Sequence, residues 1–154
     1  MEKLVAAHRT LPFNTWVRVV NLNNSQTVEV RIIDRGPFID GRIIDLSHAA
    51  AKAIGMEISG TATVRMEVIR APEGAPAVAM FAVQVGAYRE RANAEKARAD
   101  MASRFGAARI LVRPENPGVW RVMVGSETTE EAANALLSRI SQETETKAFV
   151  VRLN

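Results

Sequence analysis

The residues best suited to acid–base chemistry lie in one short segment, where Asp34 ends an apolar run and an Arg-Gly-Pro turn follows. A carboxylate at the end of a strand is held in place, and a fixed carboxylate is what general acid–base catalysis requires. The same side chain can instead accept backbone N–H bonds from its own turn. Residue types and spacing leave both interpretations of Asp34 open.

Two histidines, His8 and His48, are the other candidates for proton chemistry. An imidazole donates or accepts a proton near neutral pH, so His8 can hold the hydrogen bonds or the charge state of a site. It can equally be a barrel histidine with no chemical role. His48 is interpreted as a surface or capping residue at the start of a helix. The acidic residues and histidines show no ligand spacing, so the sequence predicts no metal site and no cofactor.

A second group of candidates comes from an internal repeat in the second half of the chain. Residues 81–86, Phe-Ala-Val-Gln-Val-Gly, resemble residues 120–125, Trp-Arg-Val-Met-Val-Gly, 39 positions later. Each copy leads into an amphipathic stretch and then another apolar run, which predicts two β-α-β units. Two such units form a four-stranded sheet with both helices on one face. We expect the opposite face to be open for binding.

Strand alternation assigns the side chains of the repeat to these two faces. The first aromatic residue of the repeat is interpreted as core, whereas Gln84, Arg121 and Met123 are predicted to face a ligand. Sugars present apolar ring faces and hydroxyls, which suit aromatic stacking and polar donors. Tyr88, expected in the loop after the strand, is a further candidate. Trp120 fits the core and the ligand face equally well.

A nucleic-acid reader is the main rival for such a sheet, because RNA-recognition sheets stack bases on exposed aromatics. That class needs several aromatics and a basic surface, whereas this face is expected to carry Gln, Arg and Met. The net charge is +3, from 20 Lys+Arg and 17 Asp+Glu, and the two signs are interspersed along the chain. The sequence therefore predicts no nucleic-acid partner.

Short strands and one helix must position the acid–base candidates. A turn at residues 23–25 is expected, because Asn tolerates the left-handed conformation of tight hairpins. Ser47 can cap a helix over residues 48–54. Alternating runs predict four strands, at residues 15–22, 27–33, 42–46 and 61–69. This pattern indicates a compact all-β barrel.

A segment with two prolines and a glycine, residues 71–77, divides the chain. Beyond it, helices are expected over residues 90–105 and from Thr128, whose capping box is completed by Glu131. The predicted domains are the barrel at 1–70, the linker at 71–78 and the α+β binding domain at 79–154.

Composition excludes several classes of protein. Residues 1–154 contain no cysteine, which excludes disulfides, thiolate zinc sites, a cysteine nucleophile and an acylated cysteine. No apolar stretch approaches the ~18 residues that a membrane span needs. With 47% hydrophobic and 24% charged residues, the sequence is typical of globular domains, and we expect a monomer.

Three blocks of the first half resemble the rare lipoprotein A family: residues 6–13 (AAHRTLPF), 30–38 (VRIIDRGPF) and 40–47 (DGRIIDLS). The resemblance implies a double-psi β-barrel that acts as a lytic transglycosylase. Such an enzyme uses the 6-hydroxyl of N-acetylmuramic acid as nucleophile and leaves 1,6-anhydro ends. It activates no water and needs no second carboxylate at glycosidase spacing.

The resemblance also assigns residue roles. It implies that Asp34 is the acid–base residue, that His8 lies beside it, and that Arg35 and Asp45 support the site. Asp45 is expected to bind the amides of the following helix. In the family, the barrel begins with a strand and a catalytic glutamate that would precede Met1, so an N-terminally incomplete barrel is expected. The alternative function is therefore a non-catalytic anchor at the division septum.

The repeat, together with Asn93-Ala94, resembles a sporulation-related (SPOR) domain over residues 80–153. That resemblance implies binding to peptidoglycan glycan strands that lack stem peptides. The two resemblances together imply a periplasmic protein of the cell envelope that acts at the septum. The family's proteins are outer-membrane lipoproteins, although residues 1–154 carry neither a signal nor the acylated cysteine.

Overall fold

The chain folds into two domains, each with its own core. The computed structural model describes residues 3–74, 78–114 and 116–154, and it divides into two compact units, Met1–Pro76 and Ala77–Asn154. Residues 75–77 of the expected linker lie outside the described residues, as do Met1 and Glu2.

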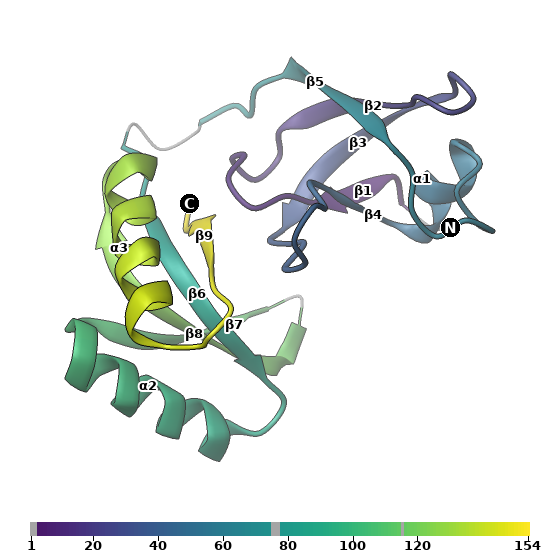
Figure 1. The fold of residues 1–154 in the computed structure, drawn as a ribbon. Helices are drawn as coiled ribbons and strands as arrows, with labels where there is room; N and C mark the ends of the chain where they lie inside the picture. Colours follow the sequence, from purple (N-terminus) through teal and green to yellow (C-terminus); the bar gives the residue numbers. More distant parts are fainter. Residues whose placement is uncertain (1–2, 75–77, 115) are drawn as a thin grey trace. The chain divides into compact units, whose positions relative to one another are not determined.

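The first unit is a five-stranded sheet with one short helix (Figure 1). Its elements are β1 (Val5–Ala7), β2 (Trp16–Asn21), β3 (Thr27–Asp34), β4 (Asp45–Leu46), α1 (His48–Ala53) and β5 (Val64–Arg70). The order across the sheet is β4-β1-β3-β2-β5, in which β1 and β3 are parallel and the other neighbours antiparallel. The parallel pair brings the residue after β1 beside the end of β3.

Alternation along β2 and β3 builds the core of this unit. Every second side chain of these strands is buried, and α1 packs against β3 and β4. Removing this apolar surface from water is the main stabilising contribution. The buried side chains are Ala6, Val17, Val19, Val28, Val30, Ile32, Ala50 and Ile54.

Two local expectations in this unit were wrong. The predicted strand at 42–46 is reduced to the two residues of β4. In the turn between β2 and β3, the left-handed residue is Ser25, with φ 62°, and not an asparagine. Asn24 acts instead through its side chain, whose Oδ1 accepts from the Gln26 N–H at 2.9 Å. The predicted cap of α1 is confirmed, since Ser47 Oγ accepts from Ala50 N–H.

The second unit is a four-stranded antiparallel sheet with two helices on one face (Figure 1). Its elements are β6 (Phe81–Tyr88), α2 (Arg91–Phe105), β7 (Ala108–Arg113), β8 (Asn116–Glu127), α3 (Glu130–Glu143) and β9 (Phe149–Arg152). The order is β7-β8-β6-β9, so the two strands of the sequence repeat are the central pair.

The core of the second unit lies between the sheet and the helices. Ala94 and Met101 of α2 and Leu136 and Ile140 of α3 pack against the valines of β6 and β8. The cap of α3 is one residue later than predicted: Thr129, and not Thr128, accepts from the Ala132 N–H at 3.1 Å.

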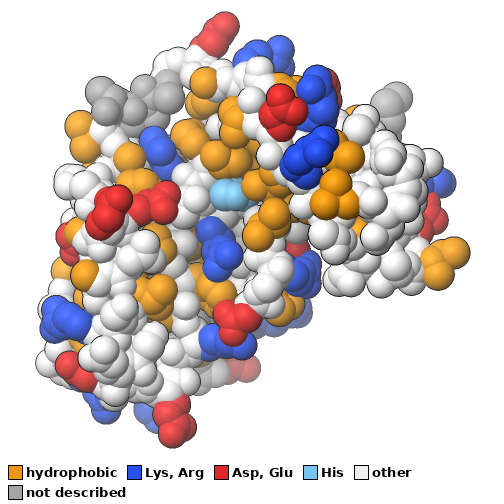
Figure 2. Space-filling view, turned by 45° about the horizontal axis from the view of Figure 1, so that its top comes forward, with side chains coloured by type: hydrophobic (Ala, Val, Ile, Leu, Met, Phe, Trp, Pro, Cys, Tyr) orange, Lys and Arg blue, Asp and Glu red, His pale blue; other side chains and the backbone are white. Residues whose placement is uncertain are grey.

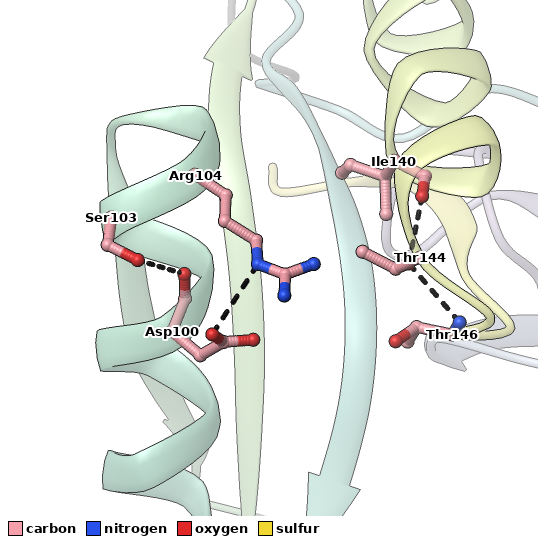
Figure 3. Close-up of polar contacts among 6 residues, drawn as sticks. All are labelled: Asp100, Ser103, Arg104, Ile140, Thr144 and Thr146. Carbon is pink, nitrogen blue, oxygen red and sulfur yellow. Dashed lines mark hydrogen bonds and ion pairs between the residues drawn. The ribbon is translucent and has the colours of Figure 1, made fainter.

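Polar contacts close the C-terminal ends of both helices (Figure 3). Near the end of α2, Arg104 Nε lies 3.5 Å from Asp100 Oδ1, and Ser103 Oγ donates to the Asp100 carbonyl at 2.8 Å. After α3, the Thr144 hydroxyl donates to the Ile140 carbonyl at 2.8 Å and accepts from the Thr146 N–H at 3.2 Å. Of the two carbonyls, that of Ile140 is among the last four of its helix, which lack partners inside the helix.

The glycines that end the two copies of the repeat are required for different reasons. A register shift between Gln84 and Gly86 turns the end of β6, and a Cβ on Gly86 would lie 2.7 Å from the Tyr88 ring. Tyr88 is therefore the last residue of β6, and its predicted place in the following loop was wrong. Gly125 has φ +80°, and its Cβ would lie 2.5 Å from Leu136.

The chain enters and leaves the second unit at one place. Asn154 accepts from the Met80 N–H at 3.0 Å and donates to the Val78 carbonyl at 2.9 Å. The Leu153 N–H also donates to the Met80 carbonyl, at 2.7 Å. These bonds extend the β6–β9 pair beyond both strands.

Candidate active site and candidate binding sheet

Asp34 and His8 are brought together by the parallel pairing of β1 with β3. Asp34 pairs with Ala7, and the His8 N–H donates to the Asp34 carbonyl at 3.1 Å. One oxygen of the Asp34 carboxylate accepts from the Arg35 N–H at 2.8 Å. The carboxylate is half-buried and anchored at the end of its strand. Both the turn contact and a position suited to acid–base chemistry are therefore present.

His8 is held as a neutral hydrogen-bond donor. Its Nδ1 accepts from the N–H groups of Thr10 and Leu11, each at 3.1 Å. In a neutral ring the proton must then reside on Nε2. Burial, followed by the charges of Arg35 and Arg9, lowers the pKa of His8 to about 4. At neutral pH the ring donates from Nε2 and carries no charge.

The lowered pKa predicts a loss of stability in mild acid. Below pH 6.5 the unfolded chain protonates His8 but the folded chain does not until about pH 4, so the unfolded state binds more protons. After allowance for solvent screening of a half-exposed group, we expect about 1–2 kcal/mol to be lost as the pH falls through this window. Urea unfolding at pH 7 and pH 5 measures it.

His8→Asn is the matched control for this prediction. The asparagine Oδ1 can accept from the same two N–H groups but does not titrate. As the pH falls from 7 to 5, the unfolding free energy of the wild type should therefore decrease relative to that of the variant. Only the titration of His8 contributes to this change. An unchanged difference between pH 7 and pH 5 would contradict the assigned pKa.

Arg35 holds the loop that carries His8. Its side chain is only 2% exposed, and Nη1 donates to the carbonyls of His8, at 3.2 Å, and Leu11, at 2.6 Å. The guanidinium also stacks on the Phe13 ring, 3.8 Å from its centroid. Arg35 thus fixes the conformation of the loop that positions His8.

Asp45 lies in the same row of the sheet as Asp34. Ala7 pairs with Asp34 on one side and with Asp45 on the other, which puts the two backbones roughly 10 Å apart. The Asp45 carboxylate pairs with the Arg42 guanidinium. The expectation that it binds the helix amides was wrong, because Ser47 caps α1 instead.

A cavity of about 940 Å³ adjoins this row, formed by residues 39–46 and 60–64 together with α1. Arg42 and Asp45 contribute charged groups to its wall, and Ile43 and Ile44 contribute apolar ones. Sequence reasoning missed it. The one available signal was that residues 40–42, Asp-Gly-Arg, directly follow the loop after Asp34.

The structure divides the predicted glycan-binding residues between the two faces of the sheet. Gln84 pairs with Met123, and Arg121 shares the face of Met123 by alternation, opposite the helix-side valines. The expectation that this face is open was wrong at these three residues, which are 4%, 0% and 6% exposed. Tyr88 and Trp120 pair with each other and pack against the helix-side core. The Arg91 guanidinium lies 5.5 Å from the Trp120 ring centroid.

Surface charge, potential metal ligands and helix hydropathy were compared with the expectations from the sequence. On the face drawn in Figure 2, basic and acidic side chains are interspersed. Across residues 3–74, 78–114 and 116–154, no three potential metal-binding side chains come together. Within the same ranges, no helix has the length and hydropathy to span a membrane.

Family models match both units. The model described as "Lytic transglycolase" matches residues 1–66, and the model described as "SPOR domain" matches residues 78–152. The match boundaries leave residues 67–77 between the two.

Curated relatives share the name endolytic peptidoglycan transglycosylase RlpA. The Vibrio cholerae protein is 32% identical over 161 residues, which cover 100% of this chain and 60% of that protein. The Campylobacter jejuni protein is 62% identical over 66 residues, which cover 43% of this chain and 24% of that protein. The aligned part of the chain thus spans less than two thirds of the length of each of these relatives.

A solved structure, the peptidoglycan binding domain of the B. subtilis cell wall lytic enzyme CwlC, covers 54% of this chain and 100% of its own. Its TM-score of 0.43 and identity of 21% are too low to support an argument. The family matches and the alignment over the whole of this chain do support an argument. The two matches give a double-psi β-barrel domain followed by a SPOR domain, and over its whole length the chain is similar to relatives named RlpA.

Proposed function

We propose that this chain is an endolytic lytic transglycosylase that cleaves peptidoglycan glycan strands lacking stem peptides. The observation that carries the proposal is the pairing of β1 with β3, which sets the anchored Asp34 carboxylate beside a neutral His8. Its relatives carry the name of that activity.

Asp34 supplies the proton transfers of the reaction. In its protonated form it gives its proton to the oxygen that leaves C1 of N-acetylmuramic acid. The 6-hydroxyl of that sugar forms the new bond to C1 and yields its proton to the Asp34 carboxylate, which restores the acid. No water is consumed. His8 donates from Nε2 to an oxygen in the site, which fits its fixed tautomer.

The second unit holds the strand for the first. We assign the barrel to residues 1–70, the linker to 71–78 and the glycan-binding domain to 79–154, and place the protein in the cell envelope as a monomer. We assign glycan contact to the face with Gln84, Arg121 and Met123; these residues are 4%, 6% and 0% exposed, so binding must first uncover them. Because the two units share one chain, binding by one raises the effective concentration of glycan at the other.

The test is an incubation of the chain with peptide-free glycan strands, followed by mass analysis of the products. Lytic cleavage gives 1,6-anhydro ends, one water lighter than the products of hydrolysis. Binding without products would support the anchoring function instead. Absence of both binding and products would overturn both.

Arg121→Gln tests the glycan-facing sheet. We expect affinity for peptide-free strands to fall by roughly tenfold, because a charged hydrogen-bond donor to the sugar is lost. Co-sedimentation in an Asp34→Asn background measures binding without cleavage, and near-ultraviolet circular dichroism checks folding. Arg104→Gln on α2, where the arginine pairs with Asp100, is the control. Equal binding by the two variants would contradict this assignment.

A further inference from the structure

The cavity beside Asp45 has the size and the lining of a sugar subsite. Its volume, about 940 Å³, lies within the range of ligand pockets, roughly 300–1,000 Å³. Ile43, Ile44 and Met56 offer apolar surface to ring faces, and Thr61 and Thr63 offer hydroxyls. Mixed linings of this kind suit carbohydrates, whose rings are apolar on their faces and polar at their edges.

One wall of the cavity carries the Arg42 guanidinium, which has more hydrogen-bond donors than its ion pair uses. The Arg42 guanidinium has five N–H donors, and among the described residues its partner is the Asp45 carboxylate, reached from Nη2. The pair is partly exposed, with 39% of each side chain accessible, so a ligand can approach the remaining donors. The fork geometry of these donors favours a carboxylate.

Two contacts link the segment that forms the cavity to the residues around Asp34. Arg9, which follows His8, donates from Nη2 to the Arg42 carbonyl at 3.4 Å. A Cβ on Gly36, in the loop after Asp34, would lie 3.7 Å from Asp45 Oδ2. The cavity therefore lies near enough to Asp34 for one glycan strand to reach both.

We propose that this cavity is a subsite for N-acetylmuramic acid with a free lactyl carboxylate, which Arg42 binds. The inference rests on the proposed function and goes further, since it explains a preference for peptide-free strands. A stem peptide converts this carboxylate into an amide and removes its charge. The arginine thus discriminates through its remaining donors, beside Asp45, with which it pairs, and Asp40, which also lines the cavity.

Methyl NMR titration of the full chain tests the subsite without requiring cleavage. The ligands are a peptidoglycan tetrasaccharide with free lactyl carboxylates, its methylamide, and chitotetraose, which has no lactyl group. We expect the acid to shift the Ile43 and Ile44 methyl signals and to bind roughly tenfold more tightly than the other two. Arg42→Gln should lower its affinity to theirs and leave theirs unchanged.

Arg18→Gln is the control, because Arg18 forms a similarly exposed ion pair with Glu29 outside the cavity. Equal affinity for the acid and the methylamide in the wild type would overturn the inference, as would a preference that survives Arg42→Gln. So would shifts confined to the second unit. A cleavage assay in parallel separates the two proposals: subsite binding without anhydro products overturns the proposed function alone, and products without discrimination overturn the subsite alone.

Discussion

Asp34→Asn should lower the rate of anhydro-end formation by about 10²–10⁴-fold, the contribution typical of a positioned acid–base group. Asparagine keeps the shape of the side chain and an oxygen that accepts from the Arg35 N–H. It cannot give or take a proton. Initial rates on peptide-free strands, with products separated by chromatography and weighed by mass spectrometry, provide the measurement.

Glycan binding and folding should be unchanged in Asp34→Asn, since Asp34 belongs neither to the proposed contact face of the second unit nor to the lining of the Arg42 cavity. Asp100→Asn serves as the control, because Asp100 lies on α2 and contacts Arg104 and Ser103. A variant at Asp34 that retains the wild-type rate would remove this residue from the mechanism. The acid would then have to be sought elsewhere, with Asp45 as the next carboxylate in the row.

Arg35→Met should destabilise the first unit by about 2–4 kcal/mol, because two carbonyls lose a charged donor inside the protein. Methionine preserves most of the stem that packs near Phe13 but none of the N–H groups. Urea unfolding followed by Trp16 fluorescence, in a Trp120→Phe background, reports on this unit. Catalysis should weaken as well, since the His8 loop is no longer held.

Arg18→Met is the matched control for Arg35→Met. Arg18 lies on β2 and forms half-exposed ion pairs with Glu29 and Glu67. Pairs of this kind contribute about 0–1 kcal/mol, so the control should change stability little. If the two variants were equally stable, the buried guanidinium would not be what supports the loop.

Much of the fold could be predicted because local and long-range preferences agree. The alternating valines of β2 and β3 specify both a strand and the face it buries. Ser47 capped its helix as expected. Thr128 and Thr129 are chemically identical neighbours, so composition could not tell which of them would cap α3.

Other features depend on pairing partners that a single segment does not encode. Tyr88 was expected in a loop because it follows Gly86, but β6 continues through a register shift against β8 and includes both residues. The strand predicted at 42–46 shortened to β4, since only Asp45 and Leu46 find a partner, in β1.

The candidate site was predictable in its residues but not in its electrostatics. Asp34 and His8 could be named from the sequence, yet the tautomer and lowered pKa of His8 depend on contacts with the turn that follows and on Arg35 and Arg9. The cavity escaped prediction because its wall combines residues from separate parts of the chain, such as Arg42 and Thr63.

The bonds that Asn154 and Leu153 make to Val78 and Met80 have a mechanical consequence. β9 runs antiparallel to β6, so a pull between the entry and exit points of the second unit loads the hydrogen bonds one after another. Strands peeled in this way yield at lower force than strands sheared along their length. Tension applied between the start of β6 and the end of β9 would unzip this unit from β9. Tension applied between the linker and a bound glycan does not load the β6–β9 hydrogen bonds in this way.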